Sequence, residues 1–246
     1  MPRTIDLNCD LGEGAGHDAQ LMPLISSANI ACGAHAGNLE TMIETVELAA
    51  RRRVAIGAHP GYFDLDSFGR AERAIDASEA ARLVLIQIEQ LYEIAGEEVR
   101  HVKLHGALYN QVSRDALLAD GLVSELARLW PNLILYALAG SMLARAGHAR
   151  GLRVAEEVFA DRTYQADGTL TPRSQPDAMI ADENLAVAQV LRILRDGVVR
   201  ATDGTDVPIK AETICLHGDG ANAVAFATRM RAELKQAGYS IRAVKV

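Results

Sequence analysis

Acidic, imidazole and glycine residues recur together along the whole chain. Side chains that can move protons or hold charge follow short apolar runs: Asp10 and Glu13, His35, His59, His105, Glu157 and Asp161, and His217 and Asp219. Carboxylates and imidazoles are the usual general acids and bases of enzymes. Glycines flank nearly all of them, which permits tight turns and lets a ligand approach the backbone. The pattern indicates a polar site assembled from several short loops.

An alternation of short β-like runs with helical periods must position these residues. Strands are expected at Thr4–Cys9, Ala28–Cys32, Val54–Ala58, His101–Leu104, Leu133–Ala137, Arg153–Val158, Thr213–Leu216 and Ile241–Val244. Apolar spacing predicts helices at Leu39–Arg53, Ser78–Ala95, Asp115–Leu129, Asp182–Arg195 and Ala221–Gly238. Strands alternating with helices form parallel βαβ units. We therefore predict an α/β fold, a (β/α) barrel of seven or eight parallel strands, with residues 1–246 as one domain.

Side-chain alternation within the strands predicts a polar barrel interior. In the first strand Asp6, Asn8 and Asp10 oppose an apolar set, and in the fourth Lys103 and His105 do the same. The apolar sets should meet the outer helices, so the polar sets should point inward. Because isolated charges are costly to bury, we expect a wet, polar cavity. Lysine rarely points inward unless it is paired or functional, so Lys103 is expected to bind an anion or stabilise an oxyanion.

The longest stretch without a helical period is Phe159–Ile180, which glycine and proline residues punctuate. Long loops inside compact α/β domains are usually functional. This one follows the sixth strand, so it should lie over the carboxyl end of the barrel, where active sites form. We expect it to close over the cavity, with Arg173 reaching inside and pairing with an anionic group.

The usual short-range sequence motifs do not identify the reaction. Asp10, His35 and His59 could hold a divalent metal ion, but no HExxH or similar ligand spacing occurs. Neither common phosphate-binding loop is present, nor a GxSxG nucleophile elbow. The residues themselves indicate a barrel-like hydrolase or lyase that acts on a small, polar, anionic substrate.

The composition limits which binding partners and which cellular compartment can be expected. The 246 residues include 25 Lys and Arg against 32 Asp and Glu, a formal net charge of −7. Nucleic acids and anionic membranes need a basic footprint, so neither is expected as a partner. No apolar run has the length of a signal peptide or a membrane span, and the three cysteines are widely spaced. These features predict a cytoplasmic protein with reduced thiols.

Seven motifs in order resemble one protein family. They begin at Asp6 (DLNCDLGE), Asn29 (NIACGAHAG), Ile56 (IGAHPGY), Val102 (VKLHGALYN), Glu157 (EVFADR), Asp167 (DGTL, followed by Arg173) and Ile214 (ICLHGD). From about Thr4 to the C-terminus the chain resembles the LamB/YcsF family, which supplies the A subunit of the bacterial ATP-dependent 5-oxoprolinase.

The resemblance implies a barrel related to those of glycoside hydrolases and polysaccharide deacetylases. It also implies two partner proteins, the B and C subunits, and opening of the lactam ring of 5-oxo-L-proline to L-glutamate. That reaction is coupled to hydrolysis of ATP to ADP and phosphate, with Mg²⁺ accompanying the ATP. The chain departs from the family pattern at Ala34, Asn38, Leu104 and residues 220–222. These departures lie beside the polar positions, so they bear on pocket shape more than on reaction class.

For this reaction we assign Asp10 or Glu13 as the general base, with Lys103 and His105 stabilising developing charge. Six further residues are expected to bind and position the substrate: His35, His59, Asp161, Arg173, His217 and Asp219. The alternative is a stand-alone, metal-dependent deacetylase or amidohydrolase with Asp10, His35 and His59 as ligands. It would need neither ATP nor partner proteins.

Overall fold

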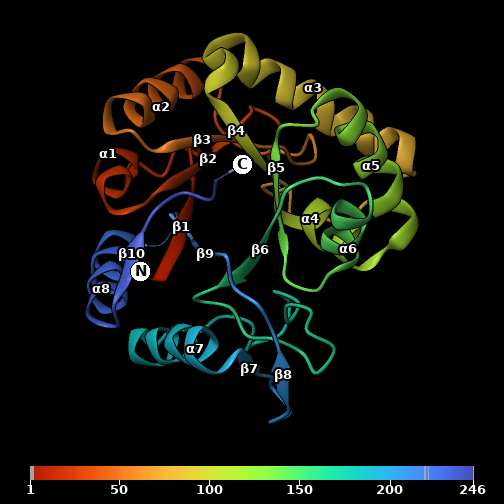
Figure 1. The fold of residues 1–246 in the computed structure, drawn as a ribbon. Helices are drawn as coiled ribbons and strands as arrows, with labels where there is room; N and C mark the ends of the chain where they lie inside the picture. Colours follow the sequence, from red (N-terminus) through yellow and green to blue (C-terminus); the bar gives the residue numbers. More distant parts are fainter. Residues whose placement is uncertain (1–2, 219, 221, 246) are drawn as a thin grey trace.

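Seven parallel strands close into a ring. The computed structural model describes residues 3–218, 220 and 222–245. The strands are β1 (Arg3–Leu11), β2 (Ser27–Ala31), β3 (Ala55–His59), β4 (Val99–Lys103), β5 (Ile134–Leu138), β6 (Val154–Phe159) and β9 (Thr213–Leu216), and β9 pairs with β1 to close the ring (Figure 1). All seven had been predicted, because each combines a short apolar run with turn residues at its ends. The predicted parallel barrel is confirmed.

The eighth predicted strand lies outside the ring. It is β10 (Tyr239–Ile241), and it pairs only with the first residues of β1, where Arg3 lies opposite Tyr239. The segment after β10 turns toward the middle of the ring (Figure 1), and Val244 packs against Ile134 and Tyr136 of β5. The predicted range of Ile241–Val244 was therefore two residues late, since Val244 is partly buried by packing at the ring and lies beyond the end of β10.

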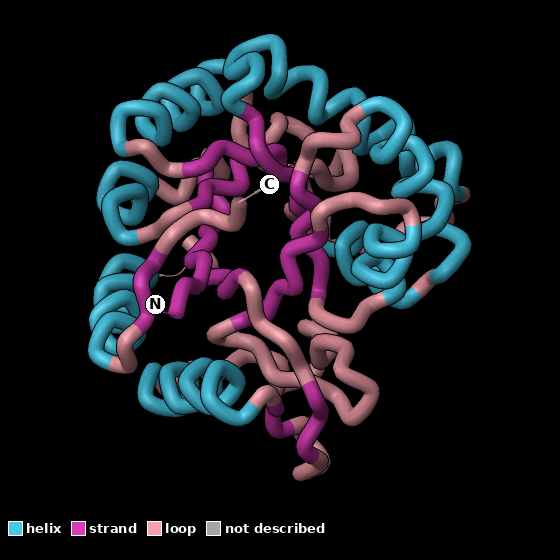
Figure 2. The backbone as a smooth tube through the Cα atoms, viewed as in Figure 1, coloured by secondary structure: helices cyan, strands magenta, loops and turns pink. Residues whose placement is uncertain are grey.

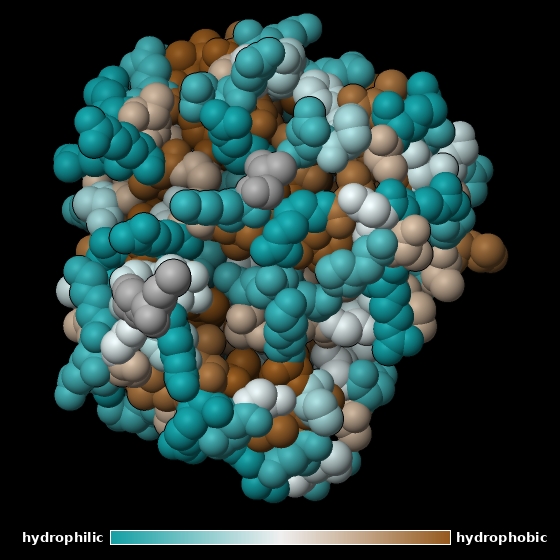
Figure 3. Space-filling view, in the orientation of Figure 1, coloured by the Kyte–Doolittle hydropathy of each residue, from teal (hydrophilic) through white to brown (hydrophobic). Residues whose placement is uncertain are grey.

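Helices surround the ring on its outer side (Figure 2). They are α1 (Asp18–Leu21), α2 (Leu39–Arg52), α3 (Ala77–Ala95), α4 (Gly106–Arg114), α5 (Ala116–Leu129), α6 (Met142–Ala149), α7 (Glu183–Asp196) and α8 (Ala223–Gln236). In α3 the predicted apolar face, represented by Ala80, Val84 and Ile88, is fully buried. Hydrophilic side chains cover the outer helices, with hydrophobic ones visible between them (Figure 3). None of the described helices is long and apolar enough to cross a membrane.

The stretch after β6 is more ordered than the sequence suggests. Arg162 is 3% exposed, and its guanidinium donates hydrogen bonds to the backbone carbonyls of Thr171 (2.5 Å) and Ala178 (3.1 Å). Backbone bridges join Arg162 to Met179 and Tyr164 to Leu170. Hydrogen bonds from the buried Arg162 therefore hold the two sides of this loop together in place of regular secondary structure.

A short hairpin of β7 (Val198–Arg200) and β8 (Asp206–Pro208) follows α7.

Candidate active site

The inner surface of the ring carries the predicted polar side chains, but they are not solvated. Asp6 accepts hydrogen bonds from the hydroxyls of Ser26 (2.6 Å), Ser27 (2.8 Å) and Thr213 (2.6 Å). Burial raises the pKa of Asp6 despite these bonds. The side-chain amide of Asn8 donates to Thr213 (2.7 Å) and to Glu157 (3.0 Å). The inward direction is therefore confirmed, while the expected wet cavity is wrong at this depth because protein groups replace the water.

Lys103 lies at the centre of this interior network. Its ammonium is 3.1 Å from Glu157 Oε1 and donates hydrogen bonds to Asp10 Oδ1 (2.8 Å) and Cys215 Sγ (3.0 Å). Burial alone would lower the pKa of Lys103, but Asp10, Cys215 and Glu157 together outweigh burial and raise that pKa well above its usual value. The sequence predicted an anion for this lysine. The anions beside it are the carboxylates of the protein itself.

Asp10 is also held by Asn29, and Asn29 is in turn held by His101. The amide of Asn29 donates to Asp10 Oδ1 (2.8 Å), and Asn29 Oδ1 accepts a hydrogen bond from His101 Nε2 (2.8 Å). The ring of His101 stacks on Tyr136 with centroids 4.2 Å apart, and a Cβ at Gly57 would collide with it. Burial lowers the pKa of His101 to about 3, so its ring is neutral. Neither Asn29 nor His101 was predicted as a site residue, although both occupy inward positions of their strands.

Glu157 is a second buried carboxylate that the assigned roles left out. The side chain is fully buried, and Tyr109 donates a hydrogen bond of 2.7 Å to Glu157 Oε2. Burial raises the pKa of Tyr109 well above its usual value, which keeps the phenol protonated as a donor. Tyr109 comes from α4, a nine-residue helix that begins at Gly106, directly after His105. Because that helix was not predicted, nothing in the sequence pointed Tyr109 toward the barrel.

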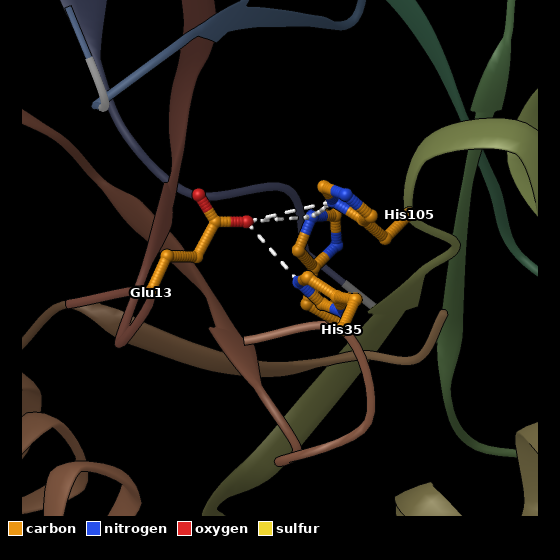
Figure 4. Close-up of side chains that lie close together, drawn as sticks. Glu13, His35 and His105 are labelled. Carbon is orange, nitrogen blue, oxygen red and sulfur yellow. Dashed lines mark hydrogen bonds and ion pairs between the residues drawn. The ribbon is translucent and has the colours of Figure 1, made fainter. Parts of the chain in front are cut away.

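Three histidines surround Glu13 above this network. Glu13 Oε1 lies 3.2 Å from His35 Nε2, 3.5 Å from His105 Nδ1 and 3.8 Å from His59 Nε2. Glu13 points toward His35 and His105 in Figure 4, and these two rings stack with centroids 3.7 Å apart. Burial lowers the pKa of His35 to about 3 and that of His105 well below its usual value. Both imidazoles are therefore neutral near pH 7.

The structure groups the residues that could bind a metal ion differently from the set expected from the sequence. The four donor atoms that lie within 4.8 Å of one another belong to Glu13, His35, His59 and His105. Asp10 instead groups with Cys215 and His217, although its Oδ2 remains 3.4 Å from His59 Nε2. Glu13 follows the carboxyl end of β1, and His105 follows that of β4.

A cavity of about 40 Å³ lies at the carboxyl end of the strands. It adjoins a groove of about 520 Å³ that shares with it Arg70, Gly106, Asn110, Leu170 and Arg173. His217 Nδ1 donates to Asp161 (2.8 Å), so its Nε2 can accept the hydrogen bond from the Arg173 guanidinium (3.1 Å). Burial would raise the pKa of Asp161, but His217 and Arg173 together with a backbone hydrogen bond outweigh burial and lower that pKa. The loop thus reaches the cavity as expected, with Arg173 donating to an imidazole held by a carboxylate.

The predicted residues converge at this end of the barrel. Seven of them line the cavity: Asp10, Glu13, His59, Lys103, His105, Arg173 and His217. His35 and Asp161 contact cavity residues from just outside it. Asp219 lies outside the described residues. Leu104, one of the departures from the family pattern, also lines the cavity.

A parallel β/α barrel with a carboxylate, lysine and histidine network at the carboxyl ends of its strands has the architecture of a barrel enzyme. The LamB/YcsF family model matches residues 5–246, and the chain belongs to this family. It is 52% identical to the A subunit of 5-oxoprolinase from Shouchella clausii, covering 97% of this chain and 98% of the relative. It is 50% identical to the protein of that name from Bacillus subtilis, covering 98% and 96%.

Two solved structures extend the comparison. The lactam utilization protein of Thermus thermophilus is 41% identical, with a TM-score of 0.89 over 98% of this chain and 100% of that one. The peptidoglycan deacetylase PdaC of Bacillus subtilis is 12% identical, with a TM-score of 0.52 over 99% of this chain and 88% of that one. The second likeness concerns the fold alone, and it confirms that the barrel resembles those of deacetylases in fold.

Proposed function

We propose that this chain is the A subunit of a 5-oxoprolinase. With the B and C subunits as partners it would open the lactam of 5-oxo-L-proline to L-glutamate, coupled to hydrolysis of ATP to ADP and phosphate. The observation that carries the proposal is the identity of about 50% over nearly the whole chain to proteins with that name. The convergence of carboxylates and imidazoles at one cavity supports it.

The reaction defines what the site must do. A lactam is a poor electrophile, and transfer of the γ-phosphoryl group of ATP to its oxygen releases ADP and activates C5. Water then adds at C5, the C5–N bond breaks, the amine takes up a proton, and a second water hydrolyses the resulting acyl phosphate. The site therefore needs a base for water, donors for developing charge and a clamp for the substrate carboxylate.

Asp10 is our choice of general base, with Glu13 as the alternative. Burial would raise the pKa of Asp10, but His59, Lys103 and His217 together outweigh burial and hold that pKa well below its usual range. Asp10 is therefore ionised at neutral pH and lines the cavity. Since Lys103 already donates to protein groups, we assign it the role of holding Asp10 and Glu157 in place. His105 lines the cavity and keeps its assigned place near the developing charge.

The remaining assigned residues would hold the substrate. We propose that Arg173, His217 and Asp161 form the clamp for anionic groups, with His59 in the cavity lining and His35 just outside it. Asp219 keeps its proposed part in substrate binding. An arginine oriented by an imidazole and a carboxylate binds carboxylates and phosphates well.

The nucleotide is expected to bind mainly on the partners. The sequence carries neither common phosphate-binding loop, so we propose that the B and C subunits supply most contacts to ATP and its Mg²⁺. We propose the cytoplasm as the compartment, where ATP is available.

The test is glutamate release from 5-oxoproline by this chain with and without ATP and the two partner proteins. Asp10→Asn should lower the rate at least 100-fold, because the base is lost while the side-chain shape remains. Asp120→Asn, at an exposed residue paired with Arg150, is the matched control and should not change it. Thermal unfolding of both variants checks the fold. Near-normal turnover by a folded Asp10→Asn variant would refute the assignment of Asp10, and ATP-independent release by the chain alone would favour the stand-alone hydrolase.

A further inference from the structure

The buried imidazole rings of His59 and His105 bring one nitrogen each close together. His59 Nδ1 donates a hydrogen bond to the backbone carbonyl of Lys103 (2.9 Å), and His105 Nε2 donates one to the carbonyl of Phe68 (2.9 Å). A carbonyl only accepts, so each of these nitrogens carries a proton. The other two nitrogens, His59 Nε2 and His105 Nδ1, lie 2.9 Å apart. With a single proton on each ring, both of these nitrogens would turn a lone pair toward the other. Something positively charged must occupy the space beside them.

Two further donor atoms point to the same space. Glu13 Oε1 lies 3.5 Å from His105 Nδ1 and 3.2 Å from His35 Nε2. A tetrahedral zinc ion with bonds of about 2.0–2.1 Å holds its ligand atoms roughly 3.3 Å apart. Four of the separations among these atoms, 2.9, 3.2, 3.5 and 3.8 Å, lie around this value, and all four atoms lie within 4.8 Å of one another. The rings of His35 and His105 stack in parallel with centroids 3.7 Å apart, so one of them would rotate to direct its lone pair at a shared ion.

We propose that Glu13, His35, His59 and His105 bind one divalent transition-metal ion, with zinc as the ion that fits the donor set best. Three imidazoles and one carboxylate suit zinc in both ligand type and number. The N–H groups of His59 and His105 that bond to backbone carbonyls are the outer-shell contacts that fix the ring orientation of metal ligands. The neutral state of His35 and His105 is the state that binds metal.

A single proton is the competing occupant. Shared between His59 and His105, it would satisfy that pair of nitrogens alone. His35 would then donate from Nε2 to Glu13 Oε1 (3.2 Å), and its buried Nδ1 would stay without a hydrogen-bond partner among the described residues. A metal ion would instead bind all four donor atoms, with the His35 proton on Nδ1.

The proposed ion would lie beside the cavity and the proposed general base, Asp10. The cavity is lined by Glu13, His59 and His105, and Asp10 Oδ2 is 3.4 Å from His59 Nε2. A bound divalent ion there would polarise a substrate oxygen or lower the pKa of water. The proposal concerns binding by this chain alone, so it does not depend on the ATP-coupled activity.

The experiment measures metal binding by the full chain, with any affinity tag removed. Metal content after purification without chelators should approach one zinc per chain. The apoprotein should bind Co²⁺ in a tetrahedral, visibly absorbing site, and Zn²⁺ should displace the Co²⁺. His105→Gln and Glu13→Gln should each weaken Zn²⁺ binding at least 100-fold, because each removes a ligand. His148→Gln is the control, since His148 is an exposed histidine of α6 paired with Glu156.

Two variants separate the ligand sets. Asp10→Asn should retain Zn²⁺ binding, since Asp10 lies outside the proposed set. Zn²⁺ should also raise the thermal midpoint of the wild-type chain, which keeps the test valid if a variant fails to fold. The proposal is overturned if the wild-type apoprotein binds neither ion at 100 µM, or if Asp10→Asn abolishes binding and His105→Gln does not. Either result leaves the glutamate-release assay to decide the proposed function separately.

Discussion

The ammonium of Lys103 lies 2.8 Å from Oδ1 of Asp10, and both side chains are buried at the end of the barrel. Glu157 Oε1 is 3.1 Å from the same nitrogen, so one cation is shared by two carboxylates. Ion pairs of this kind cost desolvation energy and contribute most by fixing geometry. Removing the cation leaves two like charges close together without solvent.

Lys103→Met should therefore destabilise the protein by about 3–5 kcal/mol, measured by urea unfolding. Lys210→Met is the matched control, because Lys210 is exposed and its ion pair with Glu212 lies at the surface. Its loss should stay within ~0.5 kcal/mol. The double variant Lys103→Met/Asp10→Asn should recover part of the loss, since one uncompensated charge is removed as well. A Lys103→Met protein as stable as the control would contradict this account.

His101 should make the fold sensitive to acid. Burial, and secondly the charge of Lys103, lowers its pKa to about 3, whereas an unfolded histidine titrates near 6.5. Between these values the unfolded chain binds a proton that the folded chain excludes, so stability falls as the pH drops from about 6.5 toward 3. The group contributes up to roughly 1.4 kcal/mol per pH unit in that window.

His101→Gln can keep a donor toward Asn29 but cannot titrate. The free energy of unfolding, measured between pH 7.5 and 4.5, should fall less steeply for this variant than for the wild type. His148→Gln removes an exposed imidazole and should leave the slope unchanged. Equal slopes for the wild type and His101→Gln would show that His101 does not carry this dependence.

Gly69 has no side chain, and His35 and His105 occupy the space that one would fill. Its φ is +64°, and an added Cβ would lie 2.8 Å from His35 Cβ and 3.1 Å from His105 Cδ2. Gly69→Ala should cost about 1–2 kcal/mol for the left-handed backbone and more for the displaced rings. Gly238→Ala is the control for the backbone part, since Gly238 has a φ of +86° and open space around it. The excess loss of Gly69→Ala over Gly238→Ala in urea unfolding measures the steric part, and no excess would contradict it.

The strands and the inward polar positions could be predicted because each depends on a local pattern. Alternation places Asp6, Asn8 and Asp10 on one face of β1 whatever the rest of the chain does. The contacts between strands could not be predicted in this way. Lys103 of β4 meets Asp10 of β1 and Glu157 of β6 only because the ring closes, and no single segment encodes that closure.

The positions of the donor atoms of Glu13, His35, His59 and His105 depend on loop conformations that could not be predicted from the sequence. His105 is oriented by the carbonyl of Phe68, a residue with a φ of +57° in the long connection after β3. Nothing in the spacing of His59 and His105 indicates that their nitrogens meet. Hence the set Asp10, His35 and His59 was expected where the structure brings Glu13 and His105 together with two of those histidines. That residues 1–246 fold as one domain stays a prediction.

Arg173 should contribute to substrate binding and not to stability. It lines both the cavity and the adjoining groove, and its guanidinium contacts His217 without being buried. Arg173→Ala should raise the KM for 5-oxoproline about tenfold, the loss of one exposed charged hydrogen bond of roughly 1.4 kcal/mol, with kcat changed much less. Arg173→Lys should recover part of the affinity, because it keeps the charge without the planar fork. Arg128→Ala, at an exposed pair with Glu125, should change neither constant, and all three variants should unfold within ~0.5 kcal/mol of the wild type. An unchanged KM in Arg173→Ala, or a loss confined to kcat, would remove Arg173 from the substrate clamp.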